Sequence, residues 1–414
     1  ALGFPTADPD IVFSPSGTDS ALHLAYIASV ILGEGFRQIV VGSDETGSRM
    51  ALASGGYHFG TRTALGAAVC REALLDGFAD TAPALEFPLR DEAGYPIPGE
   101  TIDQQVVDAV ESAVQKGQKV VLHAMDCSKT GLNGPSLKTL QYISQHWPSD
   151  VLIVVDACQM RLSRKKLRQY LSVNSAVMIT GSKFFTGPPF SGAILLPLAV
   201  SAKMSRAERI PNGLCAYTAR WSWPLSWRAV RAQLPTRKNF GEWLRWEAAL
   251  EEMHAYYSIP SAYRALGLQK FADCVSHFIT GNPRLALVPV SNRGNSSDED
   301  EFSCPTIFSF LLTSDSGSLS ASAVSRIHRI LMDGRTNDPE SQNIYRLGQS
   351  VTLGRNNSRQ TAALRASASS RLIAEAWLAG DSLETQPNLD REILTVGKAL
   401  EMAATGLPVV STLM

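Results

Sequence analysis

The chain has 414 residues, of which 44% are hydrophobic and 19% charged, and its net charge at pH 7 is −1. This balance is typical of a soluble globular protein, and the near-zero charge predicts no general affinity for nucleic acid or for an anionic membrane. The apolar runs have the length of strands and fall well short of the ~20 residues that span a bilayer.

The six cysteines are scattered and form no CxxC pair. They predict reduced thiols in an intracellular protein and argue against a disulfide framework or a zinc site. We therefore expect a cytoplasmic location. The chain opens on Ala1, without a signal-peptide pattern, and a candidate binding turn arrives by residue 16. We expect that a segment preceding Ala1 is missing, cleaved or not represented.

Strand-like and helix-like runs alternate along the chain. Amphipathic or capped segments predict helices, at Ser20–Leu32, Ile102–Gln115, Ser136–His146 and Arg161–Leu171. Short β-branched or aliphatic runs predict strands buried on both faces, at Ile39–Gly42, Val120–Ala124, Val151–Val155, Ala176–Thr180 and Ala193–Leu196. This alternation predicts an α/β protein with a mainly parallel sheet and a ligand at the carboxyl ends of its strands.

A long helical segment, Asn239–Tyr257, separates this pattern from the rest of the chain. We predict a large domain over residues 1–258 and a smaller α+β domain over residues 259–414. The sheet of the smaller domain is expected to start near Leu285–Val290 and to continue at Thr306–Leu312.

An acid and a lysine follow two successive apolar runs of the large domain. VLIVVD ends on Asp156, and the next run leads through Thr180 and Ser182 to Lys183. At the carboxyl ends of neighbouring strands, such a pair can bind the ring nitrogen and the aldehyde of one flat molecule, pyridoxal phosphate (PLP). Taken alone, Asp156 would be a turn residue, and Lys183 a loop lysine that extends to solvent. We expect Lys183 to be buried, which would make its amine nucleophilic.

An anion site is predicted near the start of the chain. In FSPSGTDSALHLAYI, Ser16, Gly17 and Thr18 precede a helix whose first N–H groups have no partner within the helix. Simple helix capping by Thr18 or Asp19 is the alternative explanation.

In this order, the three segments resemble the fold type I PLP-dependent enzymes, in the branch of class V aminotransferases and cysteine desulfurases. The branch carries Gly-Thr, Asp-Ala-x-Gln and a Ser-x-x-Lys or similar turn; this chain has Gly17-Thr18, Asp156-Ala157-Cys158-Gln159 and Thr180-Gly181-Ser182-Lys183. The likeness covers roughly residues 14–200 and extends more weakly through the C-terminal domain. It implies that PLP is the cofactor and that Lys183 carries the internal aldimine.

The resemblance also implies a role for each matching position. Asp156 is implied to pair with the pyridinium nitrogen, and Gln159 and Ser128, with Asp126 as the weaker alternative, to contact the phenolic oxygen. The phosphate is implied to lie against Gly17, Thr18 and Ser182, with Thr180 as a further contact. The branch is usually dimeric, so a homodimer is expected, in which Thr236 or Asn239 reaches the phosphate of the other subunit.

A substrate carboxylate is implied to bind an arginine of the C-terminal domain. Arginine offers a planar fork of N–H donors, and ALRASASSR supplies Arg365, with Arg355 and Arg371 as alternatives.

This chain departs from the branch at two places. The segment that usually stacks a ring on the cofactor is GSDETGSR, which has no ring. Thr46 is the candidate on that face, with His58 or Tyr57 as substitutes. No cysteine follows Cys304, so a persulfide-forming desulfurase is not expected.

Two further clusters lie outside the motifs that carry the resemblance. Tyr217, Trp221, Trp223 and Trp227 are expected either to wall the substrate pocket or to form a subunit interface. The basic run Arg161–Arg168 is expected to be a solvated helix face.

The function that follows is a PLP-dependent enzyme acting on an amino acid, first of all an aminotransferase. A lyase that cuts Cβ–S or Cβ–C is the alternative, and a decarboxylase or epimerase the third. All of these reactions need the same acid and lysine.

Overall fold

The computed structural model describes residues 2–3, 9–47, 49–80, 82–290, 300–315, 317–332, 347–356 and 359–405. It divides into two compact units. Unit 1 comprises Ala1–Leu89, Pro98–Ser128 and Asn133–His254, and unit 2 comprises Arg90–Ile97, Lys129–Leu132 and Ala255–Met414.

Unit 1 contains a seven-stranded sheet in the order β1-β7-β6-β5-β4-β2-β3. Strands β2 to β6 are parallel, whereas β7 is antiparallel to both β6 and β1. The predicted α/β class with a mainly parallel sheet is confirmed. The strands are β1 (Asp10–Ser14), β2 (Arg37–Val41), β3 (Leu85–Phe87), β4 (Val120–Met125), β5 (Val151–Asp156), β6 (Ala176–Thr180) and β7 (Gly192–Leu196).

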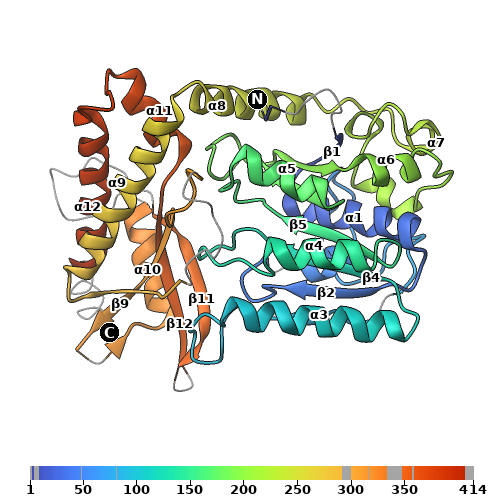
Figure 1. Ribbon diagram of the computed structural model, residues 1–414, viewed down its shortest axis with the longest axis horizontal. Helices are drawn as coiled ribbons and strands as arrows, with labels where there is room; N and C mark the ends of the chain where they lie inside the picture. The colour runs from blue at the N-terminus through green and yellow to red at the C-terminus, as the bar shows by residue number, and fades with distance from the viewer. Residues whose placement is uncertain are drawn as a thin grey trace. The chain divides into compact units, whose positions relative to one another are not determined.

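Helices cover both faces of this sheet (Figure 1). The chain steps from β2 through β4 and β5 to β6 in one direction, so right-handed crossovers place α3, α4 and α5 on one face. The step from β1 to β2 runs the other way, which places α1 on the opposite face, where it packs with α2 and α6. These helices are α1 (Gly17–Leu32), α2 (Met50–Ser54), α3 (Gly99–Gln115), α4 (Leu137–His146), α5 (Arg164–Ser172) and α6 (Leu198–Met204).

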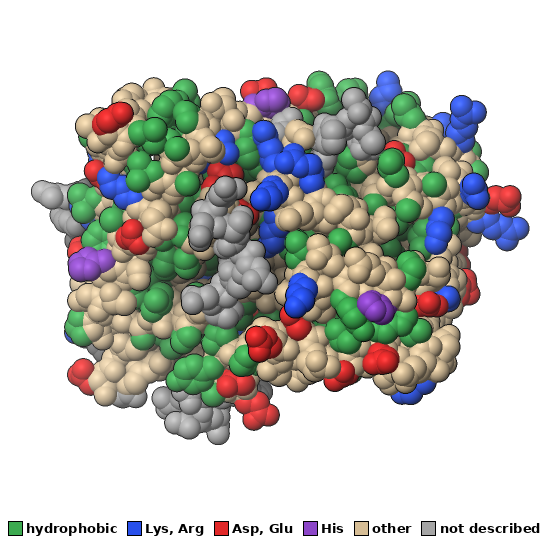
Figure 2. Space-filling model, viewed as in Figure 1, with side chains coloured by type: hydrophobic (Ala, Val, Ile, Leu, Met, Phe, Trp, Pro, Cys, Tyr) green, Lys and Arg blue, Asp and Glu red, His purple; other side chains and the backbone are tan. Residues whose placement is uncertain are grey.

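Helix α5 begins at Arg164, later than predicted, because the Ser163 hydroxyl caps it by accepting from the Lys166 N–H. Arg161 therefore lies before the helix, where it is buried with its guanidinium 5.4 Å from the Phe184 ring centre. Lys and Arg side chains gather over the part of unit 1 that carries α5 (Figure 2). The expectation of a solvated basic face is thus wrong for Arg161.

The Trp- and Tyr-rich segment of unit 1 forms two short 3-10 helices, η1 (Asn212–Ala216) and η2 (Arg220–Ser222), and then α7 (Arg228–Gln233). Tyr217, Trp223 and Trp227 are buried in the core beside α1, and only Trp221 of the four is exposed, by 52%. Neither predicted role, a pocket wall or a subunit interface, holds for the three buried rings. Their apolar area stabilises the packing of this segment on α1.

The division between the units falls within α8 (Phe240–Tyr257). Unit 2 holds a five-stranded antiparallel sheet in the order β10-β9-β12-β11, with β8 paired to β9. Its strands are β8 (Leu285–Leu287), β9 (Ile307–Ser314), β10 (Gly317–Ser318), β11 (Gly348–Asn356) and β12 (Arg359–Ser367), and its helices α9 (Ser261–Thr280), α10 (Ala321–Met332), α11 (Ser370–Leu378) and α12 (Pro387–Thr405). Across the described residues, every helix is too short or too polar to cross a membrane.

Candidate functional site

The candidate site lies at the carboxyl ends of parallel strands in unit 1. Strands β2, β4, β5 and β6 are neighbours in the sheet, so the turns that follow them meet at one edge. Asp156 ends β5 and pairs in register with Met125 of β4 and Met178 of β6. Lys183 follows β6 and Ser128 follows β4. The fold thus brings these predicted residues to the same edge of the sheet.

Asp156 and Lys183 both influence the pKa of one thiol, that of Cys158. Burial, and then the Asp156 carboxylate, raise the pKa of this thiol well above its usual value, whereas the positive charge of Lys183 lowers it. Asp156 is half-buried, and its Oδ1 accepts a hydrogen bond from the Cys158 N–H at 3.0 Å. The acid and the amine therefore lie within electrostatic range of a common point.

Lys183 occupies a tight turn that directs it outward. The Gly187 N–H donates to the Gly181 carbonyl at 2.9 Å, and the Thr186 N–H to that of Lys183 at 3.0 Å. Phe184 and Phe185 fill the interior completely, whereas Lys183 is exposed. The expectation that Lys183 is buried is therefore wrong. Among the described residues, the amine makes no hydrogen bond or ion pair.

The start of α1 lies against the loop that follows β5. Ser16 caps the helix by accepting from the Asp19 N–H at 3.3 Å. In the described part of the chain, the N–H groups of Gly17 and Thr18 have no partner. A Cβ on Gly17 would lie 2.9 Å from the Cys158 sulfur, which is closer than real side chains approach. Glycine is needed here for close packing, and the helix presents unpaired donors to an anion.

Three polar residues near Cys158 differ in whether their side chains already form hydrogen bonds. Thr180 is buried, and its hydroxyl donates to the Cys158 carbonyl at 2.7 Å. Its proton is therefore used within the protein, which makes Thr180 a structural link between β6 and the loop after β5. Gln159 and Ser182 are half-buried, and their side chains have no partner among the described residues.

The turns after β2 and β4 are joined by a contact that the sequence did not predict. The Ser128 hydroxyl donates to the carboxylate of Glu45 at 2.6 Å, and both residues are buried. Glu45 lies in GSDETG, where a charged residue in a Gly/Ser turn was the only signal. Thr46 follows Glu45 and is half-buried. Gly47 lies close to Thr18: a Cβ built on Gly47 would be 3.8 Å from the Thr18 hydroxyl.

Asp126, the alternative to Ser128, is turned toward α5. Its Oδ1 forms an ion pair with Lys166 at 2.7 Å and accepts a hydrogen bond from the Tyr170 hydroxyl at 2.9 Å. These partners assign Asp126 to holding α5 on the end of β4.

The two rings considered as cofactor-stacking groups have partners elsewhere. The His58 Nδ1 lies 2.7 Å from the Tyr217 hydroxyl, and the two rings stack at 5.7 Å. The Tyr57 hydroxyl donates to Asp80. Both rings are therefore already engaged by other side chains.

Asn239 and Arg365, predicted from the family pattern, have local partners. The Asn239 Oδ1 accepts from the Glu242 N–H and so caps α8 at 3.1 Å. In unit 2, the Arg365 guanidinium donates to the carbonyls of Gln349 and Lys129, each at 3.1 Å. Arg371 is paired with Glu375 at 3.9 Å, and the side chain of Arg355 lies outside the described residues.

Asp19, in the first turn of α1, is a buried acid that the sequence pattern did not reveal. Asp19 Oδ2 accepts from the Ser16 hydroxyl at 2.5 Å, and burial raises the pKa of its carboxyl to about 6. Burial raises the pKa of Tyr217 and Glu242, and the charge of Asp19 raises both further.

Asp19→Asn is expected to change how stability depends on pH. The folded pKa of Asp19 lies above its unfolded value of 3.8, so stability from the neutral acid is present below pH 3.8 and lost as pH rises through about 6. The variant lacks this loss, so its free energy of unfolding should rise relative to that of the wild type by about 3 kcal/mol between pH 4 and 8. Urea unfolding of both proteins across this pH range measures the difference in their free energies of unfolding. A difference that stays constant with pH contradicts the prediction.

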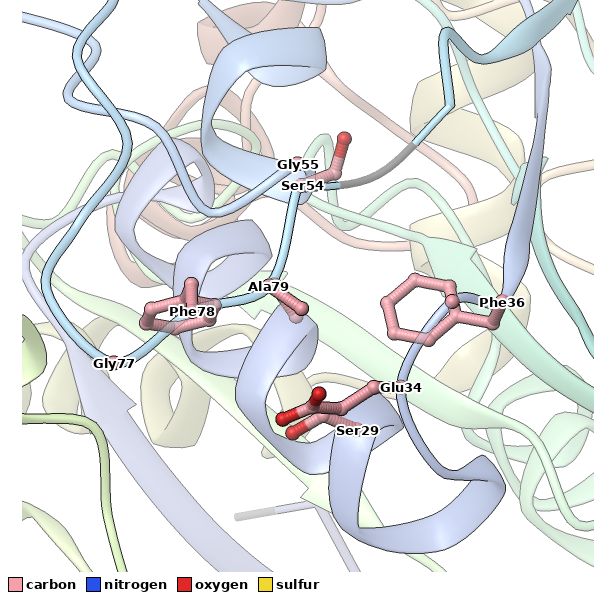
Figure 3. Close-up of a pocket in the computed structure, with 10 residues that line it drawn as sticks. Ser29, Glu34, Phe36, Ser54, Gly55, Gly77, Phe78 and Ala79 are labelled. Carbon is pink, nitrogen blue, oxygen red and sulfur yellow. The ribbon is translucent and has the colours of Figure 1, made fainter.

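A small cavity lies elsewhere in unit 1, at the carboxyl end of α1 (Figure 3). It has a volume of about 20 Å³ and is lined by Ser29, Glu34, Phe36, Ser54 and Phe78, among others. A space of this size holds about one water molecule. The cavity is therefore not a candidate for a cofactor or a substrate.

Comparison with solved structures shows the fold. An archaeal O-phosphoseryl-tRNA(Sec) selenium transferase matches with a TM-score of 0.50 and 10% identity, over 94% of this chain and 69% of that protein. The 4-hydroxyphenylacetaldehyde synthase of Rhodiola rosea matches with a TM-score of 0.50 and 13% identity, over 97% of this chain and 72% of that protein. This chain has the fold type I architecture of PLP-dependent enzymes.

No family model and no curated protein matches the sequence. The fold type I likeness is therefore one of architecture at low identity. The two solved proteins named above have different activities, a selenium transfer and an aldehyde synthesis. The reaction of this chain must be argued from its own residues.

Proposed function

We propose that the chain is a PLP-dependent enzyme that acts on an amino acid, as an aminotransferase. The observation that carries the proposal is that β5 and β6 end side by side, which brings Asp156 and Lys183 to the edge of the sheet where Gly17 packs against Cys158. An acid, an unpaired amine and a helix start with unpaired N–H groups match the ring nitrogen, the aldehyde and the phosphate of one molecule.

The residues present fit this cofactor because several of their polar groups have no hydrogen-bond partner among the described residues. The Lys183 amine, the Gln159 amide, the Ser182 hydroxyl and the Gly17 and Thr18 N–H groups have no partners among the described residues. The missing Cβ of Gly17 leaves the helix start close to the loop after β5. When bound, PLP supplies an aldehyde and a ring that accepts electrons.

Each residue then has one role. Lys183 would hold the aldehyde of the cofactor and would move a proton at the substrate carbon, and Asp156 would hold a proton on the ring nitrogen. Gly17, Thr18 and Ser182 bind the phosphate, supported by Thr180, which fixes the loop after β5. Gln159 would donate to the phenolic oxygen, Ser128 would accept from it because its own proton goes to Glu45, and Thr46 would contact the ring. Glu45 orients the Ser128 hydroxyl.

Arg365 is proposed to bind the substrate carboxylate. Its guanidinium is half-buried and held by two backbone carbonyls, which fix the plane of the fork before a substrate binds. A carboxylate bound to such a fork makes charge-assisted hydrogen bonds.

A homodimer is proposed as the working form, with Asn239 near the other subunit. Phe190, Phe240 and Trp243 are exposed by 58%, 63% and 56%, and the Arg245 guanidinium lies 5.8 Å from the Phe190 ring centre. Aromatic and arginine side chains of this kind are enriched in subunit interfaces. Sedimentation of the wild-type protein tests this, and a monomer at micromolar concentration contradicts it.

A single assay tests the reaction type. The protein is loaded with PLP and mixed with an amino acid in the absence of a keto acid. An aminotransferase stops after one half-reaction, with the cofactor left in its amine form. Continued release of pyruvate, alanine, sulfide or carbon dioxide would instead show a lyase or a decarboxylase, and racemised substrate an epimerase. Screening amino acids by the change in cofactor absorbance identifies the substrate.

A further inference from the structure

Cys158 lies at the centre of the proposed cofactor site, and its backbone is fixed on both sides. Its N–H donates to Asp156 Oδ1 at 3.0 Å, and its carbonyl accepts from the Thr180 hydroxyl at 2.7 Å. The thiol therefore has a defined position between the end of β5 and the end of β6.

The sulfur points toward the start of α1. A Cβ built on Gly17 would meet the sulfur at 2.9 Å and the Cys158 Cβ at 3.9 Å. The first distance is a clash, and the second is an ordinary van der Waals contact. The sulfur is therefore the atom against which the start of α1 packs most closely at Gly17.

The thiol also contacts the acid of the site. Burial and the neighbouring carboxylate keep the pKa of Cys158 well above its usual value, so the sulfur retains its proton at neutral pH. A hydrogen bond between the thiol and the Asp156 carboxylate is a further cause of this raised pKa. A nucleophilic cysteine needs a lowered pKa, so the direction of the shift argues against covalent chemistry at this residue.

We propose that Cys158 is a positioning residue that holds the Asp156 carboxylate and sets its separation from the phosphate-binding start of α1. This inference rests on the proposed function, because it assumes that one PLP molecule bridges the two points. PLP spans only a limited range of distances between its ring nitrogen and its phosphate, because the ring is rigid and a single –CH2–O– arm joins the phosphate to it. A spacer of fixed size between the two protein groups therefore matches them to one ligand.

The first test compares Cys158→Ser with Cys158→Ala. Serine retains a donor to Asp156, whereas alanine removes it. We expect PLP affinity, measured by absorbance titration, to fall about five- to tenfold in Cys158→Ala and to stay within about threefold of wild type in Cys158→Ser. Because Cys158 acts through Asp156, kcat should fall in the alanine variant while KM for the amino acid stays unchanged. The same affinity in both variants overturns the role of the thiol proton.

The second test is a double-mutant cycle with Gly17→Ala. In the wild-type background, the new methyl group clashes with the sulfur, so affinity for PLP and for inorganic phosphate should fall about tenfold or more. In the Cys158→Ala background, the clash is gone, and the same change should cost less than about threefold. Cys127→Ala is the matched control, because Cys127 is buried after β4 and has no contact with Gly17. In that background the full loss should remain.

Additive losses in the cycle would overturn the spacer role, since they would show that the two sites do not interact. If Cys158→Ala does not fold, as judged by circular dichroism, Cys158→Ser takes its place in the cycle, because a hydroxyl is shorter than a thiol and should recover part of the affinity. A wild-type protein that binds no PLP refutes the proposed function. Binding with an additive cycle refutes only the role of Cys158.

Discussion

Lys183→Ala is expected to abolish turnover and the covalent attachment of PLP to the chain. The amine is exposed, and among the described residues it has no ion-pair or hydrogen-bond partner, so it is available to the aldehyde. Loss of a group that both binds the cofactor and moves a proton should lower kcat by at least about 10⁴-fold. Borohydride reduction followed by intact mass measurement should add the mass of the cofactor to the wild type and not to the variant.

Two control variants sharpen this result. Lys183→Arg keeps the positive charge and should lose activity equally, because a guanidinium does not react with the aldehyde. Lys165→Ala removes an exposed lysine of α5 and should leave both activity and mass labelling unchanged. Mass labelling that persists in Lys183→Ala would show that another lysine carries the cofactor.

Asp156→Ala is expected to retain bound, coloured cofactor but to lose about 10³-fold in kcat. In the proposed mechanism the carboxylate of Asp156 keeps a proton on the ring nitrogen, and a fixed charge next to a reacting group changes the rate by about two to three orders of magnitude. Asp156→Asn keeps the size and should lose nearly as much, since it lacks the charge. Steady-state kinetics and the absorbance of the loaded proteins measure both effects.

The matched control for this prediction lies at the opposite end of the same strand. Asp150 precedes β5 and pairs with Lys119 at 2.7 Å, away from the carboxyl ends of the sheet. Asp150→Asn should keep full activity. Near-normal activity of Asp156→Asn would remove the charge of Asp156 from the mechanism.

The strands and helices of unit 1 could be predicted closely because their signals are local. Contiguous β-branched and aliphatic runs gave β2, β4, β5, β6 and β7, and helix periodicity with caps gave α1, α3 and α4. The order of the motifs placed Asp156 and Lys183 at neighbouring strand ends, and the parallel pairing of β5 with β6 confirms that arrangement.

Burial of single side chains could not be predicted, because it depends on packing between distant segments. Lys183 was expected inside, but the two phenylalanines after it take the interior. Arg161 was expected in solvent, but it packs over Phe184. The contact of Glu45 with Ser128 joins two strands that are adjacent only in the folded sheet. No local pattern contains this information.

The pairing of β1 has a consequence for the order in which the protein folds during synthesis. In the described sheet, β1 is bonded only to β7, with Ser14 opposite Gly192 and Asp10 opposite Leu196. The strand that leads into α1 thus has no partner in this sheet until the ribosome has released β7. Under the proposed function, we therefore expect vitamin B6 to bind only after the first and seventh strands have met.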